Sequence, residues 1–167
     1  MLEIWVFVSG GSETDDYRDV AKRVIRAVER IFVVGLERDV VLRHWDYREE
    51  SPDIVPLGQF ASKSLRMVDR SGAVIAILGE EIPRVTGNEI RRAIDQLTAE
   101  KTDKVWLFID AAKKNDNHRR FVRRLRRAHR VEVIYQEFTD PLDFQEKAFV
   151  ALTPYVVRQS YPSEEAS

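Results

Sequence analysis

The sequence predicts an α/β fold in which helices cover both faces of a parallel β-sheet. Strand and helix patterns alternate five times along the 167 residues. The predicted strands are short, nearly continuous apolar runs, as expected of strands that are buried on both faces. The predicted helices carry apolar residues at spacings of three and four, which gives each of them one apolar side. This alternation requires right-handed crossover connections, and these produce a parallel sheet between two layers of helices.

The first half of the chain contains two predicted strands and a helix between them. A dense β-branched and aromatic run at residues 4–8 predicts a buried central strand that ends at a glycine turn. Residues 15–34 predict an amphipathic helix whose basic residues, Arg18 among them, take the side opposite the apolar stripe. Residues 39–47 predict the second strand. Residues 48–57 follow with two prolines and no periodicity, so we expect a long loop of the kind that is often functional.

The second half of the chain continues the alternation. The apolar run at residues 73–78 breaks at Gly79, passes through a charged turn that contains Pro83, and restarts as a helix at Thr86. The other predicted elements are a helix at 58–69, a strand at 105–109, a helix at 115–128, a strand at 131–135 and a helix at 142–157.

Bulk composition bounds the class of protein. With 44% hydrophobic residues the chain can bury one ordinary core, so we expect a single domain over residues 1–158 and a polar tail or linker start at 159–167. A net charge of -1 gives no overall attraction to nucleic acid or to an anionic membrane. The absence of cysteine excludes disulfides and thiolate metal sites. No apolar run approaches a membrane span and the first residues resemble a strand rather than a signal peptide, so a cytoplasmic location is expected.

The order of the elements predicts which distant residues meet. A chain of this connectivity is expected to form the flavodoxin-like three-layer sandwich, with the strand order 2-1-3-4-5. The order reverses between the first and third strands, and ligands of such folds bind there, beyond the carboxyl ends of the strands. The loop at residues 9–14 and the loop at 80–89 should therefore face each other across one crevice.

Glu89 is the central candidate in this crevice, and it has two interpretations. The T-x-x-E capping box is matched by Thr86, Gly87, Asn88 and Glu89. In this motif the side chain of each outer residue accepts a hydrogen bond from the backbone amide of the other. Capping explains the carboxylate without any chemistry. Its position favours catalysis instead, because it follows the third strand at the switch point, beside a glycine where a ligand can come close. Gly87 and Asn88 are therefore candidate substrate-binding residues beside a candidate catalytic Glu89.

The first loop resembles a phosphate cradle. In Ser9, Gly10, Gly11 and Ser12 the glycines can turn backbone amides toward an anion, and a helix start follows. The same glycines also explain a tight strand-to-helix turn without a ligand. Neither the P-loop pattern nor G-x-G-x-x-G is present, so ATP hydrolysis is not expected. Flavin mononucleotide at this loop stays open as an alternative, and the colour of the purified protein tests it.

Aromatic and acidic residues follow the second strand. Trp45 could stack on a base or a nicotinamide ring and Asp46 could hold a hydroxyl, whereas the simpler interpretation puts Trp45 in the core and Asp46 in a turn. Asp53, in the long loop, is a further candidate for substrate binding. The three histidines are scattered without metal-ligand spacing, so neither a metal site nor a bound cofactor is expected.

The helix predicted at 115–128 is rich in arginine. Residues 119–130 hold seven arginines around an apolar stripe that contains Phe121 and Leu125. A basic face of this kind can bind phosphates or an acidic partner, but more often it is a solvated outer face. Because no aromatic residues are interleaved for base stacking, nucleic acid binding is not expected.

Several segments together resemble the TIR-like branch of the nucleoside 2-deoxyribosyltransferase superfamily, over about residues 3–110. They are VFVSGG, TDDYRDVAKRVIRAV, the proline-bearing loop, SLRMVDRSGAVIAILG and TGNEIRRAI. By this resemblance Glu89 falls on the active-site glutamate of the family, residues 9–11 on its first loop, and residues 48–57 on the loop beside the nucleotide pocket. The aspartate of the deoxyribosyltransferase pattern D-x-G-T-x-x-E is missing.

The resemblance implies cleavage of NAD, as a substrate, to nicotinamide and an ADP-ribose product in bacterial immune or stress signalling, with self-association or a partner or fused effector or sensor domain. Expulsion of nicotinamide from a pyridinium needs no general acid, whereas release of a neutral purine generally needs a proton donor as well as a carboxylate. Two alternatives stay open. One is a non-catalytic assembly or nucleotide-sensing module in which Glu89 only caps its helix, and the other is a nucleoside deoxyribosyltransferase-like enzyme.

Overall fold

The computed structural model describes residues 1–46, 57–128 and 133–161. A five-stranded parallel sheet forms its middle layer, in the order β2-β1-β3-β4-β5. This arrangement confirms the predicted fold class and strand order. The strands are β1 (Leu2–Gly10), β2 (Val40–Trp45), β3 (Ala73–Leu78), β4 (Lys104–Asp110) and β5 (Ile134–Phe138).

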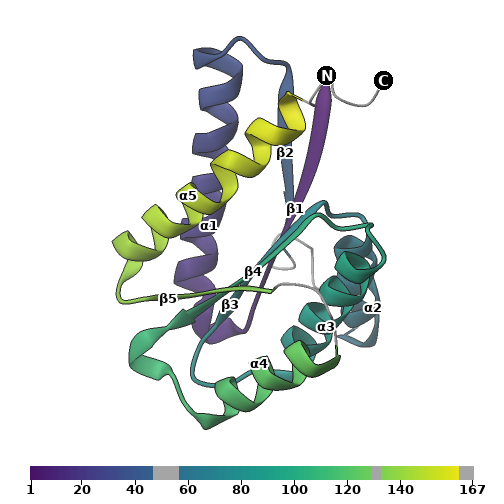
Figure 1. Ribbon diagram of the computed structural model, residues 1–167, viewed down its shortest axis with the longest axis vertical. Coiled ribbons are helices and arrows are strands. Elements are labelled where there is room, and N and C mark those ends of the chain that lie inside the picture. The colour runs from purple at the N-terminus through teal and green to yellow at the C-terminus, as the bar shows by residue number, and fades with distance from the viewer. Residues whose placement is uncertain (47–56, 129–132, 162–167) are drawn as a thin grey trace.

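Helices form the two outer layers, as Figure 1 shows. Helices α1 and α5 cover one face of the sheet, and α2, α3 and α4 cover the other. A short 3-10 turn, Ser12–Thr14, leads into α1, and a π-helical segment, Ile31–Gly35, continues it. The five helices are α1 (Asp15–Arg30), α2 (Leu57–Asp69), α3 (Arg84–Thr98), α4 (Asp116–Ala128) and α5 (Pro141–Ser160).

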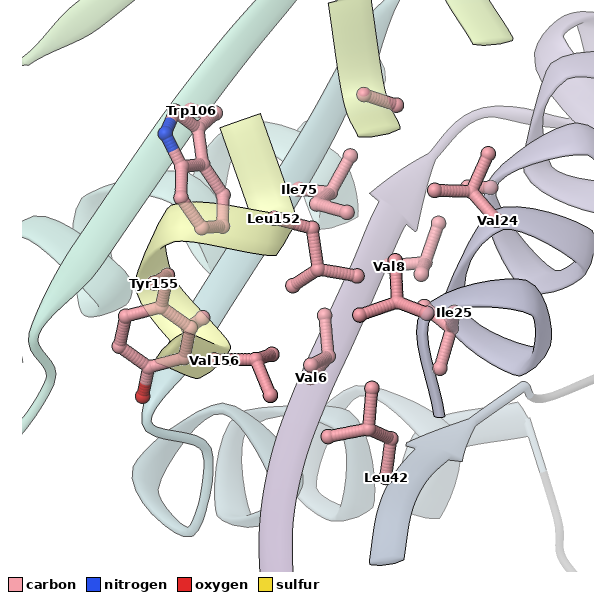
Figure 2. Packing of buried hydrophobic residues seen from close by; sticks show 14 of the residues in the cluster. Val6, Val8, Val24, Ile25, Leu42, Ile75, Trp106, Leu152, Tyr155 and Val156 are labelled. Atoms are coloured by element: carbon pink, nitrogen blue, oxygen red, sulfur yellow. The ribbon is translucent and has the colours of Figure 1, made fainter. Parts of the chain in front are cut away.

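Each face of the sheet has its own apolar core, because successive side chains of a strand point to opposite faces. Val6 and Val8 of β1 and Ile75 of β3 pack beneath α1 and α5, where Leu152 and Tyr155 close the layer (Figure 2). The other core cluster contains the alternate residues of the same strands together with apolar residues of α2, α3 and α4. Every residue of β3 is buried, which fixes this strand, and the loop that follows it, in the middle of the molecule.

Several predicted element boundaries are wrong, and two of them bear on the site and on the edge of the sheet. Helix α3 begins at Arg84 rather than at Thr86, because Pro83, with φ -57° and ψ 149°, is the residue at which the extended chain turns into the helix. The last strand ends at Phe138 rather than at 135, because Phe138 is fully buried and pairs with Asp110. Strand β5 lies at the edge of the sheet and is mostly half-buried, so its apolar pattern is weak.

Helix α4 carries the predicted arginine-rich face. Phe121 and Leu125 are buried against the sheet, whereas the six arginines between positions 119 and 127 are all exposed. The helix is therefore a covering element with a solvated basic side, as its pattern indicates. None of the helices in the described residues is both long enough and apolar enough to cross a membrane.

Candidate functional site

Strands β1 and β3 are neighbours, so the loops at their carboxyl ends lie against each other. The backbone amide of Glu81, after β3, donates to the carboxylate of Glu13, after β1, at 3.0 Å. A Cβ atom added at Gly11 would lie 2.8 Å from Cγ of Pro83. The prediction that the first loop faces the loop before α3 is confirmed by these contacts.

Glu89 lies where these two segments meet, in the second turn of α3. It is only 7% exposed, and its Oε2 accepts a hydrogen bond of 2.5 Å from the hydroxyl of Ser9, the buried residue near the end of β1. The buried hydroxyl of Ser64, on α2, donates to the carbonyl of Ala61 at 3.1 Å and also acts to lower the pKa of this carboxyl group. Three elements thus converge on one carboxyl group at the carboxyl edge of the sheet.

Burial raises the pKa of the Glu89 carboxyl above its usual range. The hydroxyls of Ser9 and Ser64 and the positive charge of Arg18 oppose this shift, because each of them favours the ionised form. A buried carboxylate costs free energy unless its environment compensates for lost hydration. The site therefore holds a carboxyl group whose pKa is raised by burial and whose ionised form is stabilised by specific neighbours. This combination is typical of functional carboxyls.

The capping-box interpretation of Glu89 is wrong. Because α3 begins at Arg84, Thr86 lies inside the first turn and is not the cap, and no side chain caps this helix end. The carbonyl of Pro83 accepts from the amide of Gly87 at 2.8 Å, as expected of the residue that precedes the first turn of the helix. The burial of Glu89 therefore cannot be attributed to the capping of its own helix.

A buried ion cluster lies beside Glu89, at the end of β2. The guanidinium of Arg18 contacts the carbonyl of Gly10 at 3.2 Å and the carboxylate of Asp46 at 3.4 Å, and Lys22 contacts the same carboxylate at 3.2 Å. Arg18 was expected on the solvent side of its helix and is instead 3% exposed. Arg18 can be buried because its guanidinium contacts the carboxylate of Asp46 and the carbonyl of Gly10 at the end of β1.

The remaining residues of the first loop and of the α3 start take different positions. The carbonyl of Gly10 accepts from Arg18 of α1, and the carbonyl of Gly11 accepts from the hydroxyl of Thr14 at 2.7 Å. Ser12 is exposed at the start of the 3-10 turn. Asn88 is exposed and accepts a hydrogen bond from Arg91 at 3.1 Å.

Trp45 and Asp53 are the other two residues selected from the sequence. Trp45 is half-buried and stacks on Phe7, with the ring centroids 5.8 Å apart and the planes 15° from parallel. One face of the indole therefore packs on the core, as the simpler interpretation has it. Asp53 lies outside the described residues.

Arg18 and Ser64 are the site residues that sequence patterns missed. Ser64 precedes the buried Met67 and Val68 by three and four positions, so helical spacing puts it on the buried side of α2. A serine on the apolar side of a helix was the available signal. Arg18 offered no local signal, because its partner Asp46 is 28 positions away. Across the described ranges, no group of three or more acidic or histidine side chains could hold a metal ion.

The fold and the site define a flavodoxin-like α/β sandwich with a buried carboxyl group on the helix after β3. Among solved structures, the chain is similar to the CMP N-glycosidase BcmB of Clostridium botulinum, with a TM-score of 0.54 and 17% sequence identity. The match covers 88% of this chain and 98% of the glycosidase. No protein-family model matches the sequence, and no curated protein matches it significantly. At this identity the likeness shows a shared fold.

Proposed function

We propose that this protein cleaves the N-glycosidic bond of a nucleotide, with Glu89 as the catalytic carboxylate. One observation carries the proposal: a carboxyl group that is buried, does not cap its helix, and accepts a hydrogen bond from the hydroxyl of Ser9 at the carboxyl edge of the sheet. That edge is where ligands bind in folds of this topology. The full-length likeness to a CMP N-glycosidase supports the same reaction class.

In the proposed reaction Glu89 acts as a single, correctly positioned anion. As the bond between C1′ and the base nitrogen breaks, its electron pair leaves with the base and positive charge develops on the ribose. The ionised carboxylate stabilises this charge or adds to C1′, and water then supplies the hydroxyl that remains on the sugar. Ser9 holds the carboxylate toward the strand edge. The elevated pKa of Glu89 makes it a stronger base than an exposed glutamate.

NAD is the first substrate that we propose. Asp46 was the second acidic group available from the sequence, and it contacts the cations Arg18 and Lys22, which fits a structural anion better than a proton donor. A site with one catalytic carboxylate suits a leaving group that departs without protonation, and nicotinamide leaves a pyridinium in that way. A signalling role and self-association accompany NAD cleavage in this proposal, and light scattering of the purified protein measures the self-association.

A pyrimidine nucleoside monophosphate is the second candidate substrate. The observation in its favour is the structural match to a CMP N-glycosidase over nearly all of that protein's length. CMP differs from NAD because a neutral pyrimidine leaves more readily when it is protonated. Activity on CMP would therefore point to a proton donor beyond Glu89.

The decisive experiment measures base release by chromatography. Purified protein is incubated separately with NAD, with CMP, and with a deoxynucleoside plus a second free base, which reports deoxyribosyl transfer. We expect release of nicotinamide, and a loss of at least about 10²-fold in Glu89→Gln. Glu80→Gln is the matched control, because Glu80 is an exposed glutamate in the loop before α3. Circular dichroism verifies the fold of both variants.

Two results would contradict the proposal. If Glu89→Gln released bases as fast as the unmodified protein, Glu89 would have no catalytic role. If the folded protein acted on none of these substrates, the non-catalytic nucleotide-sensing module would be favoured. Base exchange without NAD consumption would assign the deoxyribosyltransferase alternative.

A further inference from the structure

The π-helical segment that continues α1 exposes a cluster of apolar side chains, which we call the apolar tip. Its members are 42–70% exposed, and they are Ile31, Val33, Val34 and Leu36. Elsewhere the exposed side of this helix is mainly charged, with arginines at positions 23, 26 and 30. Single exposed apolar residues are common on protein surfaces, whereas contiguous clusters mark interaction surfaces. The apolar tip is therefore a candidate interface.

The apolar tip is held in place by the fold. Phe32, in its middle, is only 1% exposed and belongs to the core beneath α1 and α5. The amide of Leu36 donates to the carbonyl of Ile31 at 3.1 Å, and the amide of Arg38 donates to the carbonyl of Phe32 at 2.9 Å. Glu37, with φ 50°, takes the left-handed conformation at which helices often end. The segment is thus closed by hydrogen bonds and presents its apolar side chains in a fixed arrangement.

The apolar tip lies far from the candidate site. Helix α1 begins near the carboxyl edge of the sheet, where Arg18 contacts the carbonyl of Gly10, and the tip follows the other end of the helix. At a rise of about 1.5 Å per residue, Val33 lies roughly 20 Å along the helix from Arg18. Figure 1 shows this end of α1 at one extreme of the long axis of the molecule. A partner bound to the tip therefore leaves the crevice open to substrate.

The charges that flank the apolar tip make this surface complementary to itself. Arg30 precedes the tip and Glu37 follows it, and both side chains are exposed. Within the described residues neither of them forms an ion pair. Two copies of the segment can lie antiparallel about a two-fold axis that passes between Val33 and Val34. Each residue then lies opposite one that is equally far from the axis, so Arg30 of each copy meets Glu37 of the other and the apolar residues meet each other.

We propose that the apolar tip is the surface through which two copies of this chain form a symmetric dimer. A second copy fits the tip better than an acidic protein or an anionic lipid surface, because either of these would attract Arg30 but repel Glu37. The inference names the surface for the self-association that belongs to the proposed function. It uses no residue of the candidate site.

The end of α5 borders the tip and enlarges the apolar surface. The guanidinium of Arg38 lies 4.1 Å from the centroid of the Tyr161 ring, and Tyr161 and Val157 are 43% and 40% exposed. A standard interface between proteins buries about 1,600 Å² in total, and a surface of a few such side chains is small beside it. We therefore expect a dimer that dissociates at micromolar concentrations.

Sedimentation velocity of the full chain at increasing concentration measures the association. We expect monomers to convert to dimers in the micromolar range. Val34→Glu should weaken the dimer by about 100-fold, because the dimer would bury an unpaired charge at its centre. Its fold should be unaffected, since Val34 is 70% exposed. Leu142→Glu is the matched control: Leu142 is 66% exposed at the opposite end of α5, so this variant should associate like the unmodified protein.

Charge reversal tests the symmetry of the contact. Arg30→Glu sets like charges opposite each other twice in the dimer, and so does Glu37→Arg, so each variant alone should associate about tenfold more weakly. An equal mixture of the two variants should associate as tightly as the unmodified protein, because every facing pair is again opposite in charge. Absence of this rescue would contradict the two-fold arrangement.

Three further results decide the inference. A chain that stays monomeric throughout the micromolar range would overturn it, and so would a dimer that Val34→Glu leaves intact. Binding of a monomer to phosphatidylserine vesicles, lost in Val34→Glu, would overturn it in favour of a lipid-binding surface. Base release is measured in the same samples: a dimer that releases no base upholds this inference and refutes the proposed function, whereas an active monomer upholds base cleavage and overturns the inference.

Discussion

The hydroxyl of Ser9 donates to a carboxylate oxygen of Glu89 at 2.5 Å and so joins two residues 80 positions apart. Ser9 lies near the end of β1, and Glu89 lies on the helix that follows β3. The contact exists because β1 and β3 are parallel neighbours, with Ser9 in register with Ala76. The carboxyl group therefore lies at the point between β1 and β3 where the order of the strands reverses.

Replacement of Ser9 by alanine should raise the pKa of Glu89 and slow base release by about tenfold. The reason is that the ionised carboxylate loses a donor, and a hydrogen bond to a charged group contributes about 1.5–3 kcal/mol. Chromatographic assays across pH measure the rate. Ser62→Ala is the control, because Ser62 is exposed on α2. An unchanged pH profile in Ser9→Ala would show that this contact has no effect on the reaction.

The strands and the main carboxyl group could be predicted because their signals are local. Strands β3 and β4 are uninterrupted apolar runs, and their predicted bounds are correct to within one residue. Ser9 directly follows the apolar run at residues 4–8, and Glu89 lies on the helix that comes after the run at residues 73–78. Arg18 could not be placed, because its burial depends on Asp46, which meets it only in the folded chain. The edge strand β5 was placed too early because half-buried polar residues, such as Gln136 and Glu137, interrupt its pattern.

Glu89 should make the folded protein less stable as the pH rises. Its pKa is raised in the folded state. Between the ordinary glutamate pKa and this higher value, the folded chain keeps a proton that the unfolded chain has lost. Stability contributed by the neutral form is therefore fully present at low pH and is lost as the pH rises through this window.

Urea unfolding of Glu89→Gln at a series of pH values isolates this effect. Glutamine stays neutral, so the variant should gain stability relative to the unmodified protein as the pH rises from the ordinary glutamate pKa through the folded-state pKa. A helix-capping role would have given the opposite result, a loss of about 1 kcal/mol on substitution. Identical pH dependence in the two proteins would mean that burial does not penalise the Glu89 carboxylate.

Asp46 should be important for stability. Its carboxylate is only 3% exposed and contacts both Arg18 and Lys22. Asp46→Asn would remove the anion that the buried Arg18 and the half-buried Lys22 share, and the loss of one partner from a buried pair costs about 3 kcal/mol. Urea unfolding measures this loss. Asp116→Asn, which removes an exposed contact with Arg119, should change the midpoint little, and equal effects of the two substitutions would contradict the prediction.

Gly10 should tolerate no side chain, because the end of β1 is crowded by the residues that build the site. A Cβ atom at Gly10 would lie 2.3 Å from Oγ1 of Thr14 and 3.3 Å from the carbonyl oxygen of Ile77. The backbone of β3 cannot move aside cheaply, so Gly10→Ala should destabilise the protein by about 1–3 kcal/mol. Gly35→Ala is the matched control, since a Cβ atom there meets nothing within 4 Å. If thermal unfolding showed equal midpoints for the two variants, the first loop would be less tightly packed than its contacts indicate.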